Sequence, residues 1–540
     1  MPSFSFSSEK SPFVSINTAK PSLGGDLSSS DQMRKGELHI LGIVRILGSM
    51  HRILCLVILS LAPNAFAAQM DPLVRTFDMN IGEQETVALS DGNTATIRLI
   101  GLKEKLDSVN GAVRRAEVEV EVNGERATLI AATYNLPRKV GGVQIDCTVT
   151  KGYHAKGKPA SWGLKKDVRL RLWPADSPWI RPGTFVYPAK QKWFATDTQM
   201  ANDPVYVDGG ERPDRGHIYY HTGLDIGGSE GLVEIVSAVD ALVVSAAGET
   251  LAEHKRNTPV SPRYDVVYLL DDRGWYYRNS HLKTIDPSIK PGVRVRKGQR
   301  IGTLGKEGGS GGWTHLHFEA KSRQPSGEWG TQEGYAFLWQ AYVAEHQPKV
   351  IAVARPHHLL WTGESTTLDA SKSWAAGKIA KYEWTFGDGS KATGRKVKHT
   401  YQRPGRHSEI LKVTDTKGNV AYDFAVVVVY DRQHPERHIT TVHPNYYPSF
   451  DVRTGDPVTF KVRSFISDQL RAGHETWDFG DGSPPLKVRS DGNATKLDPK
   501  GYAETVHRFE KPGDYIVRVQ RTNEFGVVAT GHVWVHVQPK

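Results

Sequence analysis

The chain has 540 residues, 39% of them hydrophobic, with 52 glycines and a formal net charge of +10. This length exceeds what one hydrophobic core supports, so we expect on the order of three to five domains. The 69 Lys and Arg residues stand against 59 Asp and Glu residues without forming a dense basic block, which argues against nucleic acid as a partner.

The first 67 residues predict an export signal. Residues 1–49 are rich in serine, and we expect an extension that is disordered or that precedes the true start at Met50. Residues 50–67 combine a short basic start, an apolar run too short to span a bilayer and the cleavage pattern Ala65-Phe-Ala67. They predict a signal peptide, with a membrane-anchored N-terminus as the alternative. We therefore expect a secreted, periplasmic or cell-envelope protein with no membrane span after cleavage.

Residues 68–178 predict a β-rich domain whose role stays open. The segments Thr94–Ile100 and Ala116–Asn123 alternate polar and apolar residues, as half-buried strands do. The pair Asn123-Gly124 is typical of a hairpin turn. Signal cleavage would leave Cys147 as the sole cysteine, and its alternating context predicts a buried core thiol rather than a nucleophile.

A histidine motif opens the next region, which spans residues 179–347. In His221-Thr-Gly-Leu-Asp225 the two end residues are four apart, so they converge only if the backbone bends between them. Gly223 stands at that bend, and glycine adopts the required conformation without a steric penalty. An imidazole and a carboxylate brought together in this way are typical ligands of a catalytic zinc.

A second motif, His315-Leu-His317-Phe-Glu319, lies near the end of the same region. Side chains at i and i+2 of a strand share one face, so His315 and His317 are expected to enter the same groove. The glycine-rich stretch before them predicts short strands and an open loop. A further histidine, His281, lies between the two motifs. No His-Glu-x-x-His occurs, which excludes the helical zincin arrangement with its glutamate base.

Taken together, these motifs resemble the lysostaphin-type (LytM) zinc metallopeptidases. The resemblance covers about residues 180–345 and includes the run Gly298-Gln-Arg-Ile-Gly302-Thr-Leu-Gly305. It implies an antiparallel β-sheet core and one Zn²⁺ per peptidase domain, held by His221, Asp225 and His317. It also implies that His281 and His315 are the catalytic histidines, which serve the activated water and the developing oxyanion.

One residue departs from this family. Trp313 stands where a small residue or proline is common, in the run Gly-Ser-Gly-Gly-Trp-Thr before the second motif. The departure bears on how the substrate fits rather than on the metal.

The C-terminal third contains an internal repeat. Trp384-Thr-Phe-Gly-Asp-Gly-Ser390 recurs as Trp477-Asp-Phe-Gly-Asp-Gly-Ser483, and each copy is followed by an aromatic-x-x-Pro-Gly turn. Gly-Asp-Gly makes a tight turn after a strand whose Trp and Phe face a core. These residues resemble PKD domains, which are immunoglobulin-like β-sandwiches. We expect one at 348–432 and another at 433–540, acting as binding or spacer modules towards a polysaccharide or protein matrix.

The sequence therefore predicts a mainly β, multidomain, secreted zinc endopeptidase. The family resemblance implies peptide bonds in peptidoglycan stem peptides or cross-bridges as the substrate. Two alternatives stay open. One is a catalytically silent LytM-type domain that binds the wall and regulates another hydrolase, and the other is an adhesion protein that acts through its PKD domains.

Overall fold

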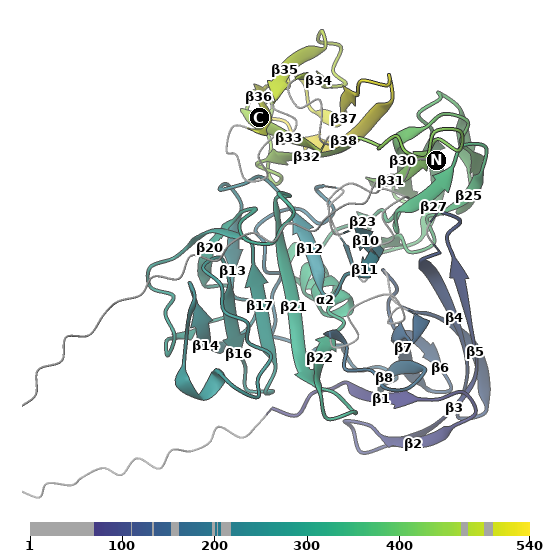
Figure 1. The fold of residues 1–540 in the computed structure, drawn as a ribbon, viewed down its shortest axis with the longest axis vertical. Coiled ribbons are helices and arrows are strands. Elements are labelled where there is room, and N and C mark those ends of the chain that lie inside the picture. Colours follow the sequence, from purple (N-terminus) through teal and green to yellow (C-terminus); the bar gives the residue numbers. More distant parts are fainter. Residues whose placement is uncertain are drawn as a thin grey trace, which may run out of the picture. The chain divides into compact units, whose positions relative to one another are not determined.

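The computed structural model describes residues 70–540 except 110, 132–133, 153–160, 197–199, 202–203, 207–217, 466–472 and 491–500. For residues 200–201, 204–206 and 218–220 it describes the backbone alone. The predicted signal peptide at 50–67 and the extension at 1–49 lie outside the described residues. Strands dominate what is described (Figure 1), as the mainly β prediction requires.

Two four-stranded antiparallel sheets form the N-terminal β domain within the described residues. The first has the order β1 (Arg75–Met79), β8 (Val168–Pro174), β7 (Val143–Thr150), β6 (Arg138–Val140). The second has the order β2 (Gln84–Ala88), β3 (Thr94–Leu106), β4 (Val113–Val122), β5 (Glu125–Ala131).

Local sequence signals in this domain are confirmed. The predicted strands correspond to β3 and β4, and the hairpin turn at Asn123-Gly124 joins β4 to β5 with positive φ at both residues (49° and 85°). Cys147 is buried in β7, and burial raises the pKa of its thiol, so it is a core residue and not a nucleophile.

The next region is built on a nine-stranded antiparallel sheet, counted over the described residues. Its main path is β15 (Glu249–Thr250), β14 (Ala241–Ala246), β16 (Val267–Leu270), β17 (Tyr276–Ser280), β21 (His315–Arg323), β12 (Leu224–Gly227), β9 (Met200–Ala201). Two strands pair beside that path, β19 (Arg294–Val295) with β14 and β22 (Trp329–Gln332) with β21. A smaller sheet has the order β13 (Glu234–Val236), β20 (Arg300–Leu304), β18 (Leu282–Ile285). The remaining elements are the pair β10 (Pro204–Tyr206) and β11 (Ile218–Tyr220) and the 3₁₀ turn η2 (Ala252–His254).

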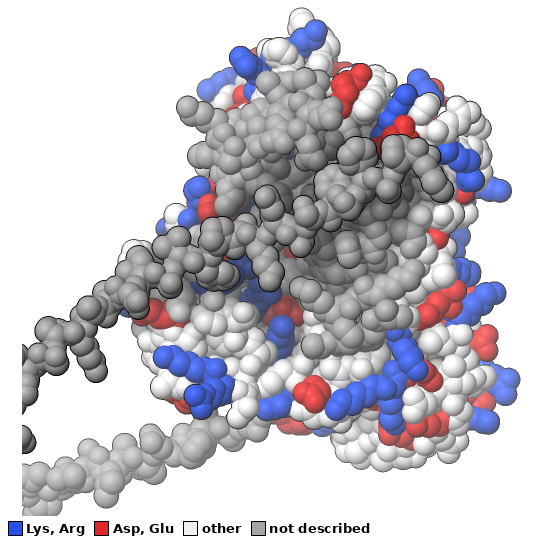
Figure 2. Space-filling model, viewed as in Figure 1, with Lys and Arg blue, Asp and Glu red and all other residues white. Residues whose placement is uncertain are grey.

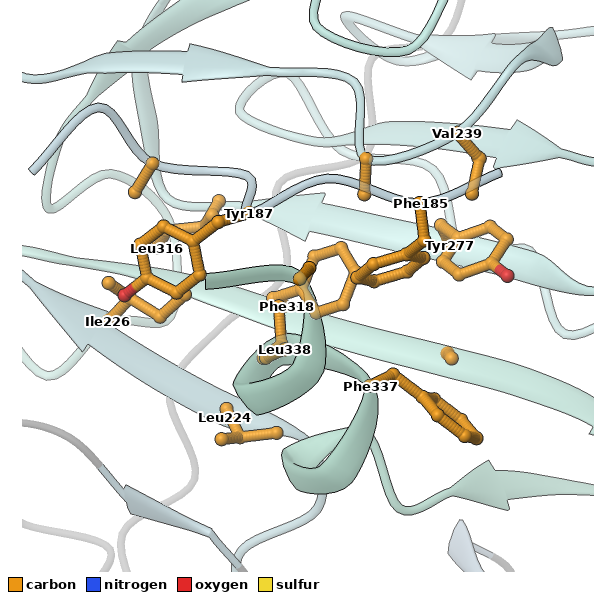
Figure 3. Packing of buried hydrophobic residues seen from close by; sticks show 14 of the residues in the cluster. Phe185, Tyr187, Leu224, Ile226, Val239, Tyr277, Leu316, Phe318, Phe337 and Leu338 are labelled. Atoms are coloured by element: carbon orange, nitrogen blue, oxygen red, sulfur yellow. The ribbon is translucent and has the colours of Figure 1, made fainter. Parts of the chain in front are cut away.

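Along β12 and β21, core residues alternate with the predicted site residues. Leu224 and Ile226 of β12, and Leu316 and Phe318 of β21, belong to one buried hydrophobic cluster, and Figure 3 shows them lying with Leu338 of the helix α2 (Tyr335–His346). Successive strand residues point to opposite faces. The intervening residues of both strands, which include the predicted ligands, therefore lie on the face away from this core.

Helix α2 packs into the interior of this domain. It begins at Tyr335, and most of its residues are buried. Tyr335, Phe337 and Leu338 are all about 1% exposed or less. The exposed residues of the helix, Ala344 and Glu345, lie in its last turn.

Both repeats form β-rich sandwich domains, as predicted. The first, PKD1, contains β23 (Val350–Ile351), β24 (His358–Trp361), β25 (Ser365–Asp369), β26 (Trp374–Ala375), β27 (Ile379–Thr385), β28 (Lys391–Thr393), β29 (Lys396–Thr400), β30 (Gly405–Asp415) and β31 (Val420–Tyr430). The second, PKD2, contains β32 (Thr441–Tyr447), β33 (Val458–Phe465), β34 (Gly473–Asp478), β35 (Leu486–Ser490), β36 (Ala503–His507), β37 (Gly513–Thr522) and β38 (Val528–Val537).

The repeated motif plays the same structural part in each sandwich. Trp384 and Trp477 are 1% and 0% exposed, so both indoles fill a core. The turn after each is held by a serine that donates to the preceding aspartate, from Ser390 to Asp388 and from Ser483 to Asp481, each at 2.6 Å. These aspartates therefore serve the turn, as the sequence suggested.

Charged residues are interspersed over the visible surface. On the part of the face in Figure 2 that is not drawn grey, Lys and Arg side chains are mixed with Asp and Glu side chains. This distribution agrees with the modest excess of 69 basic over 59 acidic residues.

Candidate metal centre and active site

The pairing of β12 with β21 places two predicted ligands opposite each other. Asp225 is the register partner of His317 in this antiparallel ladder. His221 approaches the same point because the chain turns at Gly223, which has φ +80°. The backbone thus brings together two predicted ligands that are 96 residues apart in the sequence, His221 and His317, with 3.0 Å between their ring nitrogens.

Three donor atoms form a close triangle. Nε2 of His221, Nδ1 of His317 and Oδ1 of Asp225 are each 3.0 Å from the other two. The three residues are 4%, 8% and 3% exposed. Donors around a tetrahedral zinc with bonds of about 2.0–2.1 Å are about 3.3–3.4 Å apart, so this triangle is close to the required size.

The chemistry of these donors fits a cation at the centre of the triangle. A carboxylate oxygen only accepts hydrogen bonds. If His221 and His317 both donated an N–H to Asp225, two protonated ring nitrogens would lie 3.0 Å apart and repel each other. In the described part of the chain, the ion-pair partners of Asp225 are all histidines. A buried carboxylate without Lys or Arg is costly, and a bound divalent cation would compensate its charge.

The two predicted catalytic histidines lie beside this triangle. Nε2 of His315 is 3.4 Å from Oδ2 of Asp225, and the ring centroids of His315 and His281 are 4.6 Å apart. His281 lies between β17 and β18, and its φ of +68° is unusual for a residue other than glycine. The structure therefore brings all five predicted site residues into one buried cluster.

Burial governs protonation in this cluster. It lowers the pKa of His315 to about 3 and also lowers the pKa of His281, so both imidazoles are neutral near pH 7. Burial would raise the pKa of Asp225, but the imidazoles around it outweigh that effect and hold the pKa well below its usual range. An ionised Asp225 carboxylate thus lies beside the neutral imidazoles of His281 and His315, and an ionised carboxylate is the form that binds a cation.

An aspartate that sequence reasoning missed orients His281. Oδ2 of Asp265 accepts a hydrogen bond from the backbone N–H of His281 at 3.0 Å and lies 3.4 Å from Nδ1 of its ring. Nδ1 donates to the carbonyl oxygen of Glu307 at 2.7 Å. Because a carbonyl oxygen only accepts, Nδ1 carries the proton and Nε2 is the basic nitrogen. Asp265 stays ionised because hydrogen bonds from His281 and Arg263 outweigh burial and hold its pKa below the usual range.

Glu319 is the outer partner of a predicted ligand. Its Oε2 lies 3.7 Å from Nε2 of His317, and its Oε1 accepts a hydrogen bond from Thr331 at 2.5 Å. Ligand histidines commonly have such a carboxylate behind the ring, where it sets the orientation and basicity of the imidazole. Glu319 is two residues after His317 in β21, so the strand period alone could have identified it.

A glycine substitution should show how tightly the ligand pairing is packed. A Cβ on Gly223 would lie 2.6 Å from the carbonyl oxygen of Phe318, in β21. We expect Gly223→Ala to cost about 1–3 kcal/mol more unfolding free energy than an unobstructed substitution, since overpacking has that cost. We also expect the variant to hold less metal, because β12 must shift against β21. Chemical unfolding and metal content per chain measure the two effects.

The matched control is Gly231→Ala. Gly231 has a similar φ of +74°, but nothing lies within 4 Å of the Cβ it would gain. It therefore carries the conformational strain without the collision. Equal losses of stability in the two variants would contradict the steric account of Gly223.

Comparison with family models confirms the resemblances predicted from the motifs. Residues 219–327 match the model of peptidase family M23. Residues 346–429 and 445–534 each match a PKD domain model. The M23 match contains all five residues of the buried cluster.

Among curated proteins, the chain is similar to a microbial collagenase of Vibrio alginolyticus, at 32% identity over 102 residues. The match covers 18% of this chain and 12% of that protein, so it concerns a small part of each. Among solved structures, Csd3 of Helicobacter pylori is similar over 50% of this chain and 76% of its own, at 15% identity and a TM-score of 0.19. Latent PorU of Porphyromonas gingivalis is similar over 56% of this chain and 32% of its own, at 9% identity and a TM-score of 0.17. Scores this low carry no structural inference.

No helix within the described residues has the length and apolar character needed to cross a membrane.

Proposed function

We propose that this chain, which carries an M23 peptidase domain followed by two PKD domains, is an exported zinc endopeptidase acting on peptidoglycan. The bonds cleaved would be peptide bonds of stem peptides or cross-bridges. The observation that carries the proposal is the triangle of His221, Asp225 and His317 donors, 3.0 Å on each side, with two further imidazoles against it. The signal-like residues 50–67 and the PKD pair support an extracellular setting.

The residues of the cluster divide into two roles in this proposal. His221, Asp225 and His317 would hold the Zn²⁺, which when bound supplies Lewis-acid polarisation and lowers the pKa of a coordinated water to about 7. His281 and His315 would handle protons and the developing negative charge on the carbonyl oxygen. General acid–base catalysis of this kind contributes about 10²–10⁴-fold.

The geometry of the two catalytic histidines suits these roles. Each ring donates its Nδ1–H to a backbone carbonyl, His281 to Glu307 and His315 to Trp313 at 3.2 Å. Each therefore presents Nε2 as the nitrogen that gains or loses a proton. Neutral imidazoles can accept a proton from the attacking water and return it to the leaving amine.

The silent-domain alternative has less support. A domain that binds the wall without cleaving it has no need for the three-donor triangle or for two oriented imidazoles, yet both are present. The adhesion alternative concerns the PKD domains and is compatible with catalysis in the same chain.

The test compares two substrate classes with zinc-loaded and chelator-treated protein. We expect the zinc-loaded protein to release new amino termini from purified peptidoglycan and from isolated cross-linked muropeptides. Chelation should abolish this release, and added Zn²⁺ should restore it. Gelatin is the competing substrate, because the similar Vibrio protein is named a collagenase. Cleavage of gelatin without cleavage of muropeptides would contradict the substrate assignment, and metal-independent cleavage would contradict the mechanism.

A further inference from the structure

Trp313, the residue that departs from the family pattern, contacts the second PKD domain. Its ring stacks on His443 of β32 with 4.3 Å between centroids and 30° between planes. Phe465, at the end of β33, lies against the same indole at 5.8 Å. Residues 65–540 form one compact unit. The tryptophan therefore joins the peptidase domain to PKD2 two residues before the catalytic His315.

The next residue is bound by the same domain. The hydroxyl of Thr314 hydrogen-bonds to the phenol of Tyr502, which immediately precedes β36. Thr314 is 7% exposed. Both residues that lead into His315 are thus in contact with PKD2.

A third contact reaches the other side of the site. The hydroxyl of Ser229 donates to Oδ1 of Asn445 at 2.6 Å, and these residues are 0% and 5% exposed. Ser229 follows β12, the strand that carries Asp225. A buried hydroxyl that loses its partner is destabilised by about 1–3 kcal/mol. PKD2 therefore holds both chain segments that flank the predicted metal centre.

Strand β32 packs against the PKD2 core on one face and against the peptidase domain on the other. His443 and Asn445 are two residues apart and point towards the peptidase domain, whereas Val442 and Tyr446 lie in the PKD2 core. This is the ordinary alternation of a strand. Here the outward face of β32 contacts Trp313 and Ser229 of the peptidase domain instead of solvent.

The link from PKD2 to catalysis runs through one backbone carbonyl. The carbonyl oxygen of Trp313 accepts the hydrogen bond from Nδ1 of His315 at 3.2 Å. The position of Trp313 therefore sets the tautomer and the direction of the His315 ring. We infer that PKD2 is a working part of the catalytic unit, in which His443 and Asn445 are positioning residues for His315 and for the Asp225 segment. This inference rests on the proposed function and assigns PKD2 more than the spacer role expected from its family.

The experiment compares two histidine stacks of the same kind in the full-length, zinc-loaded protein. His443→Ala removes the stack on Trp313. His507→Ala removes a stack on Phe479 at 3.8 Å. Among the described residues, the side-chain partners of His507 all belong to PKD2, and they are Phe479, Phe509 and Asp481. We expect His443→Ala to lower kcat on a soluble muropeptide about 10-fold or more with KM changed less than about 2-fold, since displacement of a catalytic group by about 1 Å has effects of this order. His507→Ala should keep kcat, and His443→Phe should restore it by restoring the stack.

A second measurement separates this inference from the proposed function. Amide hydrogen exchange of residues 310–318 should accelerate in His443→Ala and not in His507→Ala, whether or not the substrate is correct. Unchanged exchange in the PKD2 core strand β37 would show that the domain remains folded. If His443→Ala matches the wild type in kcat and in exchange at 310–318, PKD2 is an attached module and the inference is wrong. Absence of turnover in the wild type would defeat the proposed function, while the exchange result would still decide the role of PKD2.

Discussion

Replacing His317 by alanine is expected to remove both the metal and the activity. His317 contributes Nδ1 to the triangle and is held at 3.0 Å from both His221 and Asp225. Two remaining donors make a poor site for zinc, which takes three protein ligands in catalytic centres. Loss of several kcal/mol of transition-state stabilisation corresponds to at least about a 10³-fold fall in kcat/KM. Metal analysis of purified protein and turnover of a cross-linked muropeptide measure the two losses.

His254→Ala provides the control for this substitution. His254 lies in the same domain, in the 3₁₀ turn η2, where its Nδ1 is hydrogen-bonded to the phenol of Tyr276 at 2.9 Å. Its removal takes away one imidazole without touching the triangle, so metal content and turnover should be retained. Wild-type turnover in the His317→Ala protein would refute the metal mechanism.

The second large effect is expected from His281→Ala, with a different signature. His281 is beside the triangle but is not one of its donors, so the protein should keep about one metal ion per chain. Removal of a general acid or base should lower kcat by about 10²–10⁴-fold. The comparison of His281→Ala with His317→Ala therefore distinguishes a proton-transferring imidazole from a ligand.

The outcome that contradicts this assignment is loss of metal from His281→Ala, which would make His281 a ligand. Its orientation offers a further check. Asp265 binds the backbone N–H of His281 and lies against its ring. Asp265→Asn keeps the size of the side chain and removes its charge, so a smaller loss of kcat with full metal content is the expected result for a positioning residue.

Trp313 connects two domains that are far apart in the sequence. From the sequence alone, it is a residue that differs from the family pattern and bears on substrate fit. In the fold it stacks on His443 of a domain more than 100 residues further along the chain. If PKD2 positions the predicted catalytic His315, as inferred above, deletion of the C-terminal domains is expected to lower kcat on a soluble muropeptide.

Much of the site could be predicted from the sequence because its residues are marked by local rules. The strand period places His315, His317 and Glu319 on one face, and a glycine at 223 is required where the chain must bend so that His221 meets Asp225. The repeated Trp-x-Phe-Gly-Asp-Gly-Ser motif likewise defines a strand and its turn within a few residues. Such features depend on the backbone geometry of a few consecutive residues, so they can be predicted without knowledge of the tertiary structure.

Other features were decided by tertiary structure alone. Nothing in the local sequence connects Asn445 with Ser229, because this contact depends on how two domains pack together. Asp265 and His281 flank the consecutive strands β16 and β17, and the register of that pair, with Val267 opposite Asn279, brings them together. The interior position of α2 also depends on tertiary structure, because its apolar residues are buried only when they pack against the β-sheet. Local periodicity determined which residues could form the metal centre, and long-range packing determined which neighbours orient and support them.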